Sequence, residues 1–123
     1  MEPFQDVFVV SLNAGVANGG TYKTVPSGKR AVIEHVSLDA TVGGAALLRC
    51  DYLITSTIEG NSAFRQVPIM TAQTATGFVQ GSHPLRAYAA TGTQFGAVIR
   101  RFGDLSQHII ASFVIVGYYV PVP

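Results

Sequence analysis

Hydrophobic residues occur in this chain as about nine short runs in which alternate positions are apolar, and turn-forming residues separate the runs. Period-two alternation places successive side chains on opposite faces of an extended strand, whereas the residues of a helix repeat every 3.6 positions. No segment has the helical period. Gly, Pro, Asn and Ser lie between the runs, where turns need positive φ angles and no ladder N–H group is required. The chain is therefore predicted to be all-β.

Nine strands follow from these runs. They are predicted at Asp6–Leu12, Thr21–Val25, Ala31–Val42, Ala45–Ile58, Ala63–Met70, Thr76–Gln80, Leu85–Ala89, Thr93–Phe102 and His108–Val120. Many short strands at even spacing favour a two-sheet antiparallel β-sandwich of the jelly-roll type over a barrel of long hairpins. The 123 residues are expected to form one domain, 1–123, because domains of about 100–150 residues are the commonest.

The last predicted strand differs from the others because both of its faces are apolar. Phe113 and Ile115 alternate with Val114 and Val116, so neither face is polar. In an antiparallel sandwich one face of a strand meets the core and the other usually meets water. Charged residues also make up only 12% of the chain, against about 25% in an ordinary domain. We therefore expect a homo-oligomer. The candidate interface residues are Val114, Val116, Tyr118 and Val120.

The charge pattern limits the partners and the location that can be expected. Eight basic and seven acidic residues are scattered and give a formal net charge of +1. Nucleic-acid binding is not expected, because it needs a basic patch or stripe. No run reaches the ~18 apolar residues of a membrane span, and the first residues lack the features of a secretory signal. The location stays open between the cytoplasm and an assembled particle.

No catalytic set, metal site or cofactor is predicted. His35, Ser37 and Asp39 share one strand face and have the residue types of a hydrolytic triad. Same-face neighbours on a strand are about 6.6 Å apart, beyond the roughly 2.6–3.2 Å reach of a hydrogen-bonded relay. The three histidines also lack the His-x-His or His-x-x-x-His spacing of a metal site. We therefore expect a protein that is not an enzyme.

The loops divide into two groups of different chemistry. If every strand crosses the sandwich, successive loops fall at alternate ends, and residues 26–30, 59–62, 81–84 and 103–107 then lie together. Loops on a rigid sandwich commonly carry binding residues, so this charged end is the predicted ligand-binding end. Its candidate residues are Lys29, Arg30, Glu59, Asn61, His83, Asp104 and Gln107. The loops expected at the opposite end carry no charge.

Glu34 is a carboxylate at an otherwise apolar register. It shares a predicted strand face with Val32 and Val36, and Arg101 occupies a similar position among apolar residues of another strand. A buried charge without a partner costs several kcal/mol. Two interpretations remain. Either Glu34 and Arg101 form a partly buried ion pair, or a β-bulge turns Glu34 outward.

Three segments carry a resemblance to known families. Val25-Pro26-Ser27-Gly28-Lys29-Arg30-Ala31-Val32-Ile33-Glu34, His83 to Ala89 and Ser112 to Val120 resemble a set of short bacterial proteins of unassigned function. This likeness covers most of the chain from Val25 onward and implies a small all-β protein. The Phe-x-x-x-Gly-Tyr pattern from Phe113 also resembles the last strand of C1q and tumour-necrosis-factor-type jelly rolls, which form trimers around an apolar axis. That second likeness favours a trimer.

Two classes of function are compatible with these observations. The first is a non-catalytic structural or assembly subunit that forms a homo-oligomer through apolar strand faces. The second is a lectin-like module that binds a glycan at loop ends displayed from an oligomer, where carboxylates and amides supply the acceptors and donors. The lack of Trp counts against the second class, because sugar sites commonly use an aromatic platform and only tyrosines are available here.

Overall fold

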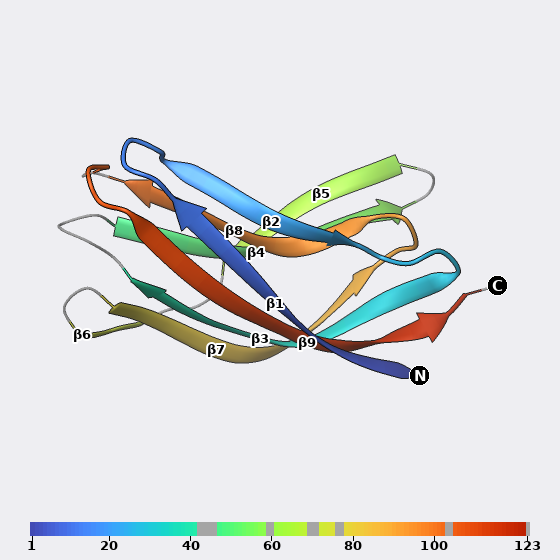
Figure 1. The fold of residues 1–123 in the computed structure, drawn as a ribbon. Helices are drawn as coiled ribbons and strands as arrows, with labels where there is room; N and C mark the ends of the chain where they lie inside the picture. Colours follow the sequence, from blue (N-terminus) through green and yellow to red (C-terminus); the bar gives the residue numbers. More distant parts are fainter. Residues whose placement is uncertain (42–46, 59–60, 69–71, 76–77, 103–104, 123) are drawn as a thin grey trace.

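The computed structural model describes residues 1–41, 47–58, 61–68, 72–75, 78–102 and 105–122, and it gives the backbone alone for 47–50, 52–58, 61–68, 72–75, 78 and 83. These residues form nine strands and no helix (Figure 1). The strands are β1 (Glu2–Leu12), β2 (Asn18–Thr24), β3 (Lys29–Thr41), β4 (Leu47–Ile58), β5 (Asn61–Pro68), β6 (Ala72–Ala75), β7 (Phe78–Ala89), β8 (Gln94–Phe102) and β9 (Ile109–Pro121). No helix long and apolar enough to cross a membrane is found in the described part.

The strands form two antiparallel sheets, as the sequence predicts. The five-stranded sheet has the order β1-β9-β3-β7-β6, and the four-stranded sheet has the order β2-β8-β4-β5. The pairing is nested, because β1 pairs with β9, β2 with β8, β3 with β7 and β4 with β5. The chain is thus a long two-stranded ribbon that bends so that successive strand pairs alternate between the sheets. Further pairing of β9 with β3 and of β8 with β4 completes each sheet.

One hydrophobic core lies between the two sheets. The rings of Phe8 in β1 and Phe95 in β8 meet edge to face with centroids 5.8 Å apart, and Phe4 lies 5.5 Å from Phe95. Alternate residues of each core-facing strand are buried, as period-two patterning requires. In β9 these are Ile109, Ala111, Phe113, Ile115, Gly117 and Tyr119. The apolar pattern, which is the same on both faces of this strand, does not identify the core face, whereas the structure places Phe113 and Ile115 on it.

The middle of the chain differs from the strand prediction. The segments Thr76–Gln80 and Leu85–Ala89, predicted as separate strands, belong largely to the single strand β7, and the predicted loop 71–75 contains the short edge strand β6. Pro84 indicates a break in the sequence, yet it lies inside β7. It pairs with His35 where the register of β3 shifts, and a bulge is one of the places where a sheet accepts proline.

The predicted Glu34–Arg101 ion pair is wrong, and the alternative β-bulge is observed. The register shifts between Ile33 and His35 in both strand pairings of β3, and Glu34 is exposed. Arg101 lies in β8 of the other sheet and is only 2% exposed. Its guanidinium donates hydrogen bonds to backbone carbonyls instead. These belong to Val16 (2.7 Å), Asn13 (2.6 Å) and Gln107. Carbonyl oxygens therefore take the place of the expected carboxylate.

Candidate functional site

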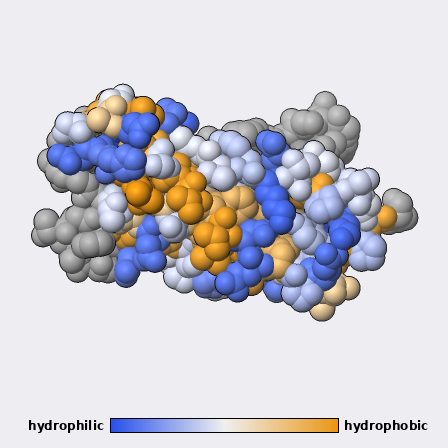
Figure 2. All heavy atoms as spheres, in the orientation of Figure 1, coloured by the Kyte–Doolittle hydropathy of each residue, from blue (hydrophilic) through white to orange (hydrophobic). Residues whose placement is uncertain are grey.

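The outer face of the five-stranded sheet carries exposed valines on neighbouring strands. Val7 of β1 pairs with Val114 of β9, and Val9 follows Val7 two residues later on the same face. Val7 and Val9 are 62% and 52% exposed. Figure 2 shows hydrophobic surface gathered over parts of β1 and β9. We call this surface the outer valine patch. It comprises Val7, Val9, Ile110, Val114 and Val116.

The four candidate interface residues all lie on this outer face of β9. Val114, Val116, Tyr118 and Val120 are half-buried and alternate with the fully buried residues that face the core. β9 is a central strand, with β1 on one side and β3 on the other. Only one of its two apolar faces therefore packs in the core between the sheets. The other face is directed away from the four-stranded sheet.

Polar residues occupy the part of the outer face that is formed by β3 and β7. Ser37 and Asp39 lie opposite Val114 and Ser112 of β9, and a hollow of about 480 Å³ lies beside Asp39. A 3.1 Å hydrogen bond joins His35 Nε2 to Ser82 Oγ on β7 rather than to Ser37. The outer face thus has an apolar half on β1 and β9 and a polar half on β3 and β7.

The residues predicted to form one charged ligand-binding end do not come together. Lys29 and Arg30 begin β3 at the end where β1 begins and β9 ends, which we call the terminal end (Figure 1). Gln107 lies before β9 at the far end, where its carbonyl accepts a hydrogen bond from Arg101. The far end is where Leu12 and Ile109 pair. The predicted site is therefore wrong for these described members.

Of the four other residues predicted for this charged end, the structure describes two, Asn61 and His83. Asn61 is the first residue of β5 and pairs with Ile58. His83 lies within β7, opposite Val36, rather than in a loop at either end. The two carboxylates predicted for this cluster, Glu59 and Asp104, lie outside the described residues.

Backbone hydrogen bonds show which loops share an end. The Gly92 N–H donates to the Val25 carbonyl at 3.2 Å, so the loop after β7 lies at the terminal end beside the loop after β2. The Gly15 N–H donates to the Leu105 carbonyl at 2.7 Å, so the loop after β8 lies at the far end. The sequence-based prediction placed residues 90–92 with the loop at 13–20 and residues 103–107 with the loop at 26–30, so both loops lie at the ends opposite to those predicted. The reason is that β7 crosses the sheet once where two strands were counted.

The terminal end contains a set of side chains that the sequence did not indicate. An ion pair of 2.5 Å joins Lys29 Nζ to Glu2, and another of 3.0 Å joins Lys23 Nζ to Asp6. Burial lowers the pKa of Lys23, but the hydrogen bonds that Lys23 donates to Asp6, the charge of Asp6 and the nearby Tyr119 hydroxyl group outweigh this effect, and the pKa is raised overall. Both lysines lie near Tyr119, and their Nζ atoms are 6.0 Å and 5.7 Å from its ring centroid.

The comparisons with known proteins bring no further assignment. No protein-family model matches the chain, and no curated protein matches it. Within the described part, no group of three or more His, Cys, Asp or Glu side chains is placed to hold a metal ion.

Proposed function

We propose that this protein is a non-catalytic assembly subunit that forms a homo-oligomer through the outer face of its five-stranded sheet. The outer valine patch carries the proposal. Val7 and Val9 are mostly exposed and adjoin the half-buried Val114 and Val116 on the neighbouring strand. Soluble monomers seldom expose a contiguous apolar surface of this kind, and contact with a second copy would remove it from water.

The size and the charges of the outer face of the five-stranded sheet support a second copy of this chain as its binding partner. The four long strands have 11–13 residues each. With usual strand spacing and rise, these four strands form a face of about 20 Å by about 40 Å, which is roughly 800 Å². This area is about what each partner buries in an interface of standard size. Glu34 and Asp39 on β3, together with Arg30 and Arg86, supply exposed charges of both signs. A symmetric contact can therefore bring opposite charges together around the apolar centre.

The nested strand pairing supports a sandwich of the jelly-roll type as the finer description of the fold. A ribbon whose strand pairs alternate between two sheets is the arrangement of that architecture, with β6 as an added edge strand. Jelly rolls are common in capsid and lectin domains. The resemblance of the last strand to C1q and tumour-necrosis-factor-type proteins favours a trimer, and β9 lies inside the five-stranded sheet, between β1 and β3.

Sedimentation of two outer-face variants tests the assembly. At micromolar concentration the wild-type protein should sediment as an oligomer of its 13.0 kDa chain. Val114→Asp and the more exposed Val7→Asp should both give folded monomers, because a carboxylate in the interface would lose its hydration. Circular dichroism measures whether they stay folded.

The matched control is Phe102→Asp. Phe102 is an exposed apolar side chain at the end of β8 in the four-stranded sheet, so this change should leave the oligomer intact. A wild-type protein that sediments as a 13.0 kDa monomer would contradict the proposal. So would an oligomer that survives in both outer-face variants.

A further inference from the structure

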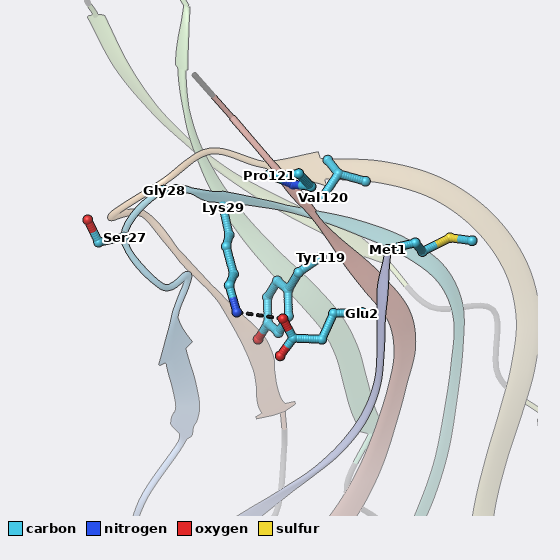
Figure 3. Close-up of a pocket in the computed structure, with 8 residues that line it drawn as sticks. All are labelled: Met1, Glu2, Ser27, Gly28, Lys29, Tyr119, Val120 and Pro121. Atoms are coloured by element: carbon cyan, nitrogen blue, oxygen red, sulfur yellow. Dashed lines mark hydrogen bonds and ion pairs between the residues drawn. The ribbon is translucent and has the colours of Figure 1, made fainter.

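A cavity of about 300 Å³ opens at the terminal end of the two sheets (Figure 3). The first residues of β1, the turn before β3 and the last residues of β9 line it. Its polar side chains are those of Glu2, Ser27, Lys29 and Tyr119, and Val120 and Pro121 add apolar wall. Lys29, Glu2 and the Tyr119 hydroxyl group lie close together in Figure 3.

Tyr119 contributes a buried hydroxyl group that makes no hydrogen bond of normal geometry among the described residues, although it lies near enough to Lys23 to help raise the pKa of that lysine. The residue is only 6% exposed, and its ring packs against Phe4 with centroids 4.7 Å apart. A buried tyrosine hydroxyl normally finds a partner, because leaving it unpaired costs free energy. Phenylalanine would fill the same space without that cost. Packing alone therefore does not explain why a tyrosine, with its hydroxyl group, occupies position 119.

The charges around the cavity favour a neutral ligand over an ion. Glu2 neutralises Lys29, and Asp6 neutralises Lys23, so each ammonium group already has a carboxylate. Among the side chains that line the cavity, Glu2 offers an acceptor, Lys29 a donor and Tyr119 a hydroxyl group, and the two side-chain charges cancel. An alcohol group suits this set, because it can donate to a carboxylate and accept from an ammonium group at once.

We propose that the cavity binds a neutral polyhydroxylated ligand, a single sugar ring or a cyclic polyol. One ligand hydroxyl bridges Glu2 and Lys29, and a neighbouring hydroxyl bonds to the Tyr119 hydroxyl. Small-molecule sites span about 300–1,000 Å³, and a volume at the lower bound suits one ring. The side chains of Glu2 and Lys29 are 60% and 36% exposed. Such an exposed ion pair is weak, so the two side chains can separate to admit the ligand.

This site is independent of the proposed assembly. Tyr119 is on the core face of β9, whereas Tyr118 is on the outer face that forms the candidate interface. A glycan ligand agrees with the lectin-like class of function, but its residues differ from the loop cluster that the sequence predicted. The recognition is by hydrogen bonds, because the Tyr119 ring is packed against Phe4 and does not form a stacking platform.

Titration of the full chain, followed by amide NMR shifts, tests the site. The probes are glucose, galactose, mannose and myo-inositol, with glucuronate as the anionic counterpart. At least one neutral probe should shift the amides of Glu2, Gly28, Lys29 and Tyr119 together. Tyr119→Phe should weaken that binding about tenfold, the loss expected for one hydrogen bond. The matched control is Tyr22→Phe, an exposed tyrosine on β2 that does not line the cavity, and it should leave the affinity unchanged.

The melting temperature without ligand gives a second measurement. Tyr119→Phe should melt at the same temperature as the wild-type protein or higher, because it removes an unpaired buried hydroxyl group. A lower melting temperature would show a structural hydrogen bond and overturn the proposal. No shift with any neutral probe, binding of glucuronate alone, or equal binding by Tyr119→Phe would overturn it as well.

Discussion

Arg101 is a buried cation whose partners are backbone carbonyls rather than a carboxylate. Its guanidinium contacts the loop after β1 through Asn13 and Val16 and the loop before β9 through Gln107. The planar fork of a guanidinium can donate to several acceptors at fixed angles, which a lysine cannot do. One side chain thus fastens two loops that lie far apart in the sequence. The apolar register of Arg101 marks it as buried, but a local pattern does not identify distant carbonyls as its partners.

Replacement of Arg101 should be costly for stability. Arg101→Met removes three charge-assisted hydrogen bonds of a side chain that is only 2% exposed, so we expect the free energy of unfolding to fall by about 3 kcal/mol. Urea denaturation measures the change. Arg100→Met is the matched control, because Arg100 is exposed, and it should cost under about 0.5 kcal/mol. Equal losses in the two variants would count against a structural role for the Arg101 hydrogen bonds.

β9 needs a glycine at one position because the strands beside it leave no room for a side chain. A Cβ atom on Gly117 would meet the backbone carbonyl of Val32 and would lie 3.0 Å from the Phe4 ring. Gly117 pairs with Ile33, directly before the β-bulge of β3. The space above the glycine is filled by Phe4, which also contacts Tyr119 and Phe95. The bulge and the glycine therefore belong to one packing arrangement.

Gly117→Ala should accordingly destabilise the protein by about 2 kcal/mol, the usual cost of overpacking a core. Thermal unfolding checks the result. Gly28→Ala provides the comparison, since a Cβ there meets nothing within 4 Å but the φ angle is +76°. That variant measures backbone strain alone and should cost about 1 kcal/mol. A smaller loss at Gly117 than at Gly28 would mean that the strands separate easily to admit a methyl group.

Across the whole molecule, side chains join the two sheets along the margin where β1 and β2 meet. The Thr21 hydroxyl donates to the Val9 carbonyl at 2.8 Å, and Lys23 forms its ion pair with Asp6. These contacts add to the core in holding the sheets face to face. The ion pair is exposed, so its contribution to stability is small.

The stability supplied by Lys23 should depend on pH in a defined direction. Its pKa is raised above 10.5 in the folded state, so the protonated form is favoured by folding. The contribution is fully present below pH 10.5 and is lost as pH rises through the folded pKa. The melting-temperature difference between the wild-type protein and Lys23→Met should therefore be constant at lower pH and shrink above 10.5. A difference that grows with pH would contradict this sign.

The sequence predicts the properties that depend on local alternation and fails for those that depend on distant pairing. Alternation identifies the all-β class, because each strand shows its buried side every second residue, but it does not identify the core face of β9, since both faces of that strand are apolar. It does not show that the chain passes through Pro84 without turning. For this reason the loop cluster was misplaced. Alternation also does not predict that Glu2 pairs with Tyr119, because the two residues lie at opposite ends of the sequence.

The pairing of the first strand with the last has a consequence for the time course of folding. β9 is the central partner of both β1 and β3, and Glu2 pairs with Tyr119. During synthesis, β1 leaves the ribosome first but has no neighbour in its own sheet until β9 has also emerged. Contacts of such high sequence separation form slowly, because the intervening chain must lose its entropy first. Closure of the five-stranded sheet therefore waits for the last of the nine strands, and the valines of β1 have no neighbouring strand until then.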